Sequence, residues 1–127
     1  MPVGYMGGYT PKNKIHSMQK RKRFTREETQ NENLTLALFK TEWNGACQIV
    51  SMIYDDLAES YRANAGFFTV DYEEDPELSS EFGIREVPTI LFFKEGQLVD
   101  HAVGLTAKNE LISKIESALN PDSQSIH

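Results

Sequence analysis

This 127-residue sequence has little cysteine, no long hydrophobic run and no recognisable secretion signal. Its single cysteine, Cys47, excludes a disulfide within the chain. No apolar run approaches the roughly 20 residues that a membrane-spanning helix needs. The first 15 residues also lack the apolar core of a signal peptide. We therefore expect no membrane association and a location in the cytoplasm, where cysteines stay reduced.

Acidic residues are absent from one end of the chain. The first 26 residues hold seven of the 13 basic residues and none of the 19 acidic ones, which gives +7 there, −13 for the remainder and −6 in total. The run Lys20–Arg23, with Tyr5 and Tyr9, is a possible nucleic-acid contact. The alternative that we favour is a flexible, solubilising arm that lies near the acidic body.

Motifs for metal, phosphate or cofactor binding are also missing. The three histidines, His16, His101 and His127, share no local ligand spacing. The acidic residues between positions 71 and 77 lack the spaced ligand loop with a central glycine that calcium sites use. No glycine-rich phosphate loop is present. We expect no metal and no cofactor.

The remaining sequence alternates between helical and strand patterns, and its 39% hydrophobic content suits one compact domain. Thr25 and Glu28 have capping-box spacing, which predicts a short helix that ends before Asn33. The apolar run at 34–39 predicts a buried central strand. A helix follows over 44–64, with Ile49 and Ile53 on its buried face, and then a strand over 67–72.

Turn and cap residues define the other elements. Asp75 and Pro76 predict a short helix through position 82. Strands at 89–93 and 98–103 are separated by a short turn and predict an antiparallel hairpin. Thr106 is the expected cap of a last helix that ends at Asn120. The order predicts an α/β fold with a central mixed β-sheet flanked by helices on both faces.

Three segments of the chain resemble thioredoxins: "WNGAC" after the buried strand, "VDYEEDPELSSEFGIREVPTILFFKEGQLV" in the middle and "VGLTAKNELISKIESAL" near the end. The resemblance implies a thioredoxin-like domain at 24–120, an arm at 1–23 and a tail at 121–127. In that family the proline that matches Pro88 is cis and faces the redox motif, so a cis Pro88 is expected.

The chain departs from the family where the chemistry takes place. Thioredoxins attack with a thiolate at a helix N-terminus and resolve the mixed disulfide with a second cysteine. Asn44 replaces the first cysteine and Cys47 matches the second, so the dithiol cycle is impossible. Leu38 replaces the buried acid and Thr69 the lysine beside it, so the proton-handling groups are missing too. Met52 replaces the kinking proline and Lys40 an apolar residue.

Asn44 and Cys47 each have a structural and a chemical interpretation. Asn44 is an excellent helix N-cap, and a polar ligand contact is the alternative. Cys47 is interpreted first as a buried core thiol. Its alternative is a single-cysteine redox site that forms mixed disulfides with glutathione or a partner thiol.

Two functional hypotheses follow. The favoured one is a non-catalytic protein- or peptide-binding adaptor module that uses the groove beside the cis proline. The alternative is a single-cysteine thiol-disulfide oxidoreductase that acts through Cys47 as its catalytic residue with an external thiol. The residues expected to line the groove are Trp43, Asn44, Gly45, Val87, Pro88, Thr89 and Gly104.

Overall fold

The computed structural model describes residues 23–31 and 33–120. The predictions for the basic arm before Arg23 and for the tail at 121–127 therefore lie outside the described residues. The elements, in chain order, are η1 (Arg26–Gln30), β2 (Leu34–Lys40), α2 (Gly45–Ser60), β3 (Ala65–Asp71), α3 (Pro76–Glu81), β4 (Thr89–Lys94), β5 (Gln97–Val103) and α4 (Lys108–Leu119).

The four described strands form one mixed sheet in the order β3-β2-β4-β5. Strand β2 is parallel to β3 and antiparallel to β4, and β4 and β5 form the predicted antiparallel hairpin. Six of the seven β2 residues are buried because the strand has a neighbour on each side and is covered on both faces. The prediction of a buried central strand at 34–39 is confirmed.

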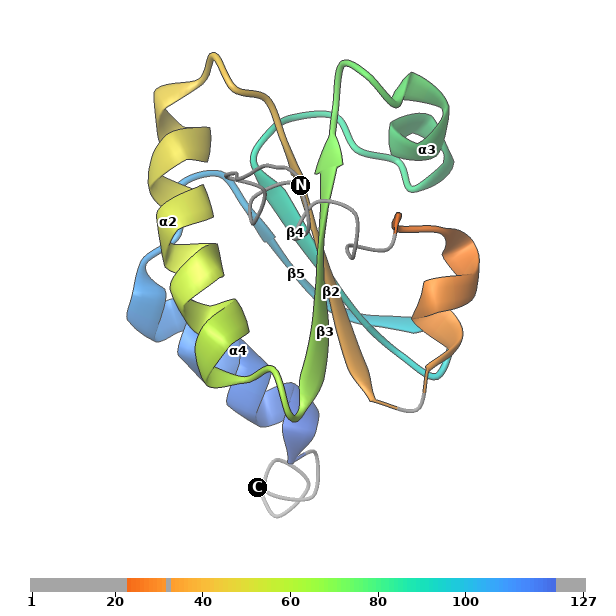
Figure 1. The fold of residues 1–127 in the computed structure, drawn as a ribbon, viewed down its shortest axis with the longest axis vertical. Coiled ribbons are helices and arrows are strands. Elements are labelled where there is room, and N and C mark those ends of the chain that lie inside the picture. Colours follow the sequence, from red (N-terminus) through yellow and green to blue (C-terminus); the bar gives the residue numbers. More distant parts are fainter. Residues whose placement is uncertain (1–22, 32, 121–127) are drawn as a thin grey trace, which may run out of the picture.

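Helices cover both faces of the sheet, as Figure 1 shows, with α2 and α4 on one face and η1 and α3 on the other. On the first face, Val50 and Tyr54 of α2 pack with Leu111 and Ile115 of α4 over the strands. On the second face, Phe24 lies among the rings of Phe39, Phe68, Phe82 and Phe93. Each core thus joins residues that are distant in the sequence.

The short helix predicted before Asn33 is present as η1, but two predicted caps and one predicted buried residue are wrong. Thr25 makes no side-chain cap hydrogen bond, and η1 is a 3-10 helix that begins with a bond from the Glu28 N–H to the Thr25 carbonyl. The Thr106 hydroxyl donates to the Gly104 carbonyl, and Ala107 precedes α4 instead. Ile49 is 49% exposed because the buried stripe of α2 runs through Cys47, Val50, Tyr54 and Leu57.

The β4–β5 turn and η1 hold each other in place. Glu95 and Gly96 both have positive φ, at 52° and 82°, as a two-residue hairpin turn requires. Their N–H groups donate to the carbonyls of Asn31 and Thr29, at 3.0 and 2.7 Å.

None of the helices in the part of the chain that the structure describes has the length and hydropathy of a membrane-spanning segment.

Candidate functional site beside the cis proline

The N-terminus of α2 is closed by Asn44. Its backbone is extended and its side-chain oxygen accepts a hydrogen bond of 3.0 Å from the Cys47 N–H. This N–H is one of the donors left unpaired at a helix start, which would otherwise be available to an anion or a thiolate. Asn44 thus takes up a donor at the position where thioredoxins place their reactive sulfur.

Cys47 lies in the first turn of α2 and has no exposed surface. Its Sγ accepts a contact of 3.5 Å from the Thr41 N–H. A depression of about 390 Å³ beside this turn is lined by Lys40, Thr41, Glu42, Cys47, Gln48, Ser51 and Met52. Cys47 borders the depression, yet its thiol remains enclosed, which disfavours attack on an external disulfide without local movement.

The peptide bond between Val87 and Pro88 is cis, which confirms the expectation from the resemblance. The Pro88 carbonyl accepts a 2.7 Å hydrogen bond from the Gly104 N–H. The Thr89 hydroxyl donates to the Glu86 carbonyl at 2.6 Å, and Thr89 is buried. The loop before β4 and the loop after β5 are therefore joined.

The sheet register brings the predicted groove residues to one end of the molecule. Thr89 pairs with Phe39 on one side and with Val103 on the other. The segment after β2, the cis proline before β4 and Gly104 after β5 therefore leave the sheet at the same end. Val87, Pro88, Thr89 and Gly104 form one connected group there. Trp43, Asn44 and Gly45 form a second group at the start of α2.

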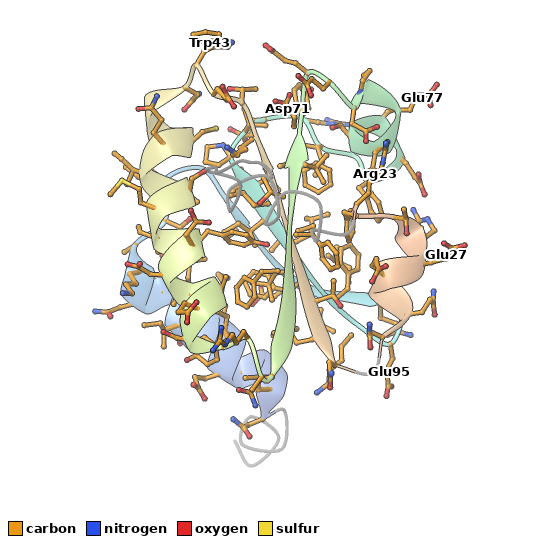
Figure 2. All side chains as sticks on the ribbon, viewed as in Figure 1. Arg23, Glu27, Trp43, Asp71, Glu77 and Glu95 are labelled. Carbon is orange, nitrogen blue, oxygen red and sulfur yellow. The ribbon has the colours of Figure 1, made fainter. Side chains whose placement is uncertain are left out.

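Trp43 is the most exposed large apolar residue among those described, at 85%, and Figure 2 shows it projecting beyond the start of α2. A side chain added at Gly45 or at Gly104 would meet no other atom within 4 Å, so the surface is open at both glycines. The backbone is therefore open at Gly104 on this end of the sheet, and the start of α2 carries an exposed indole.

Two exposed apolar residues at this end were missed by the sequence interpretation. Leu105 and Val103, on either side of Gly104, are 62% and 44% exposed. The apolar pair around a single glycine in "VGL" was the available signal. The strand pattern accounts for Val103, and a sequence pattern does not report the exposure of a loop residue such as Leu105.

Two buried side chains behind the motif, Leu38 and Tyr54, are unsuited to proton transfer. Leu38 is buried at 1% exposure and pairs with Thr69 on β3 and Ile90 on β4. The buried Tyr54 donates to the Phe68 carbonyl at 2.6 Å, and burial raises the pKa of its hydroxyl well above the ordinary value. Neither side chain can exchange a proton near neutral pH.

Among the residues that the structure describes, no three His, Cys, Asp or Glu side chains are arranged to hold a metal ion. What the site offers is backbone at a cis proline, open glycines and exposed apolar side chains. These features define a mixed α/β protein with open glycines and exposed apolar side chains at one end of its sheet.

Comparison with known proteins identifies the family. The thioredoxin family model matches residues 15–117, so the chain belongs to the thioredoxin family. The match begins inside the segment that the sequence analysis assigns to the arm, and the boundary between arm and domain stays a prediction. The fold class predicted from the sequence is confirmed.

Similar proteins include two thioredoxins known by sequence and one thioredoxin of solved structure. The chain is 34% identical to thioredoxin of Porphyra purpurea over 97 residues, which cover 76% of this chain and 87% of that protein. It is 31% identical to thioredoxin of Pyropia yezoensis over 96 residues, which cover 75% of this chain and 90% of that protein. The thioredoxin structure from Malassezia sympodialis superposes with a TM-score of 0.68 at 27% identity and covers 74% of this chain and 82% of that one.

Proposed function

We propose that this chain is a thioredoxin-family protein that binds a protein or peptide partner at the groove beside Pro88 and carries out no dithiol chemistry. The observation that supports this most strongly is the Asn44 cap. Its side-chain oxygen accepts a hydrogen bond of 3.0 Å from the Cys47 N–H, at the position where the family places a thiolate. The N–H group at this position therefore has a partner within the protein and is not left free for a sulfur anion.

The binding mode that fits this surface is strand addition. An extended peptide would pair with the backbone at Val87, and its side chains would contact Trp43 and Leu105. Trp43 is suited to be the anchor, because an exposed indole supplies a large apolar area with few rotatable bonds. Such binding needs no sulfur on either partner.

A displayed library of cysteine-free peptides, selected on the wild-type protein, tests the proposal. For the selected peptides we expect Cys47→Ser to leave the Kd within about twofold and Trp43→Ala to raise it at least tenfold. Leu98→Ala is the matched control, because Leu98 is also exposed, at 54%, but lies on β5 away from Pro88. Peptides that bind Trp43→Ala as well as wild type would refute the groove.

A single-cysteine activity has one observation in its favour, the contact of the Thr41 N–H with the Cys47 sulfur. A backbone donor of this kind stabilises a thiolate, which could attack oxidised glutathione, form a mixed disulfide and release one glutathione thiolate. The enclosed thiol and the absence of an acid at Leu38 oppose this function.

An insulin-reduction assay with dithiothreitol separates the two functions. We expect wild type and Cys47→Ser to give the same rate as buffer. A Cys47-dependent increase in turnover would establish the single-cysteine function and overturn the non-catalytic hypothesis.

A further inference from the structure

The described part of the chain begins at an acidic groove. Residues 23–31 and 33–120 hold 17 acidic and eight basic residues. The preceding segment has no acidic residue and holds the five other basic residues, Lys12, Lys14, Lys20, Arg21 and Lys22. The two parts therefore carry opposite net charge and are joined at Arg23.

The groove consists of two depressions beside β3, which lies at one edge of the described sheet. The first, of about 370 Å³, lies between α2 and β3 and is lined by Arg23, Tyr54, Asp55, Ala58, Phe67, Phe68 and Thr69. The second, of about 210 Å³, is lined by Arg23, Phe24, Thr69, Val70, Asp71, Glu74, Asp75 and Leu78. We call the two together the acidic groove.

Arg23 already lies in this groove. It lines both depressions and forms an ion pair of 2.7 Å with Asp75, and Figure 2 shows it near α3. Asp55 and Glu74 form no ion pair with any residue in the described ranges. Two carboxylates on the walls are therefore left for further cations.

We propose that the segment 12–22 docks within the same molecule on the acidic groove, with Lys20, Arg21 and Lys22 facing Asp55, Asp71 and Glu74. Chain connectivity supports this placement, because three residues span no more than about 10 Å and the chain enters from Arg23. Unlike charges at such distances attract, and the attraction weakens as salt is added.

The segment of the same chain is favoured over that of a second copy. A tether of a few residues gives an effective concentration in the millimolar range, far above that of the free protein. Docking would also place the basic side chains against carboxylates and reduce their availability to nucleic acid. The proposal is independent of the function assigned to the groove beside Pro88.

Paramagnetic NMR on the full chain tests the docking. A nitroxide is attached at Ser17→Cys, with the enclosed Cys47 left in place and single labelling checked by mass. A second sample carries Cys47→Ala. We expect the strongest broadening at the amides of Asp55, Thr69 and Glu74, and the weakest at Val99 and Lys114.

Charge reversal provides the matched comparison. Asp55→Lys with Glu74→Lys should reduce the broadening of the Thr69 amide at least threefold, as should 0.5 M salt. The control is the double variant Glu95→Lys, Glu110→Lys. It makes the same change in net charge outside the acidic groove and should leave the broadening of the Thr69 amide unchanged. The proposal is overturned if the broadening is uniform over the protein, or if it is unchanged when Asp55 and Glu74 are replaced by lysine. So does broadening in ¹⁵N-labelled protein mixed with spin-labelled, unenriched protein, because that result assigns the groove to a second copy.

Discussion

At the scale of single residues, the proposed chemical difference between this protein and its family rests on Asn44. Its side chain caps α2 through the Cys47 N–H and the thiol of Cys47 turns into the core. The same position that could supply a nucleophile at a helix N-terminus supplies stability here. Asn44 therefore supports the helix start at the position where we propose that the redox reaction is lost.

Replacement of this cap should lower stability. Asn44→Ala removes the acceptor of the Cys47 N–H, and we expect a loss of about 1 kcal/mol in the free energy of unfolding, measured by urea denaturation. Asn44→Asp is the control and should stay close to wild type, because aspartate caps equally well. Equal stability of the alanine variant would contradict the capping role.

Tyr61 gives a prediction about alkaline pH. Its hydroxyl donates to Glu116 at 2.6 Å, and this hydrogen bond is the main cause that raises the pKa of Tyr61 to about 12. Because the folded-state pKa lies above the unfolded value near 10, the contribution to stability is complete below pH 10 and is lost between pH 10 and 12. Since solvent screens the pair, we expect less than about 1 kcal/mol.

Tyr61→Phe measures this contribution directly. The variant should be less stable than wild type at pH 8, and the difference should shrink toward pH 12. Titration of the buried Tyr54 is common to both proteins and cancels. A difference that stays constant between pH 8 and 12 would show that Tyr61 contributes by packing alone.

At the scale of elements, the hairpin turn at Glu95 and Gly96 connects β4 and β5 and supports η1. The Gly96 N–H donates to Thr29 at 2.7 Å, so a 3-10 helix and a hairpin from different parts of the chain depend on one turn. Gly96 has a φ of +82°, and a side chain there would meet Gln30 Oε1 at 2.8 Å.

Gly96→Ala should therefore destabilise the protein by about 1 to 2 kcal/mol in thermal or urea unfolding. Gln30 is a flexible side chain, so Gln30→Ala in the same protein should recover little of that loss, because backbone strain dominates. Gly45→Ala is the control, since Gly45 has open space and no positive φ. Full recovery by Gln30→Ala would show that the steric contact dominates instead.

Elements were predicted well where one residue pattern decides the structure. The apolar run of β2 and the cap and proline before α3 needed only local information, and the Asp75 side chain does accept from the Leu78 N–H. Thr25 and Thr106 failed as caps because the pattern gives spacing but not the backbone angles at the start of a helix. Ile49 failed because four-residue spacing does not fix which neighbouring stripe of α2 faces the sheet.

At the scale of the whole molecule, the candidate site beside Pro88 depends on contacts between segments far apart in the sequence. Three loops lie at one end of the sheet, because Thr89 pairs with both Phe39 and Val103. Two of these loops are joined by the hydrogen bond from the Gly104 N–H to the Pro88 carbonyl. The residues at 43–45 and 87–89 could be named in advance because the family resemblance supplied that geometry. Leu105 could not, because exposure depends on packing that a sequence pattern does not report.

The central claim is that the groove beside Pro88 binds peptide without sulfur chemistry. The most direct test is an amide chemical-shift map of the Cys47→Ser protein titrated with one selected cysteine-free peptide. We predict that the largest shifts cluster at Trp43, Gly45, Val87, Thr89, Gly104 and Leu105 and saturate with the Kd of the wild-type complex. Shifts that cluster instead around Val99 and Lys114 would contradict this binding site, as would shifts that occur in the wild-type protein but not in the Cys47→Ser protein.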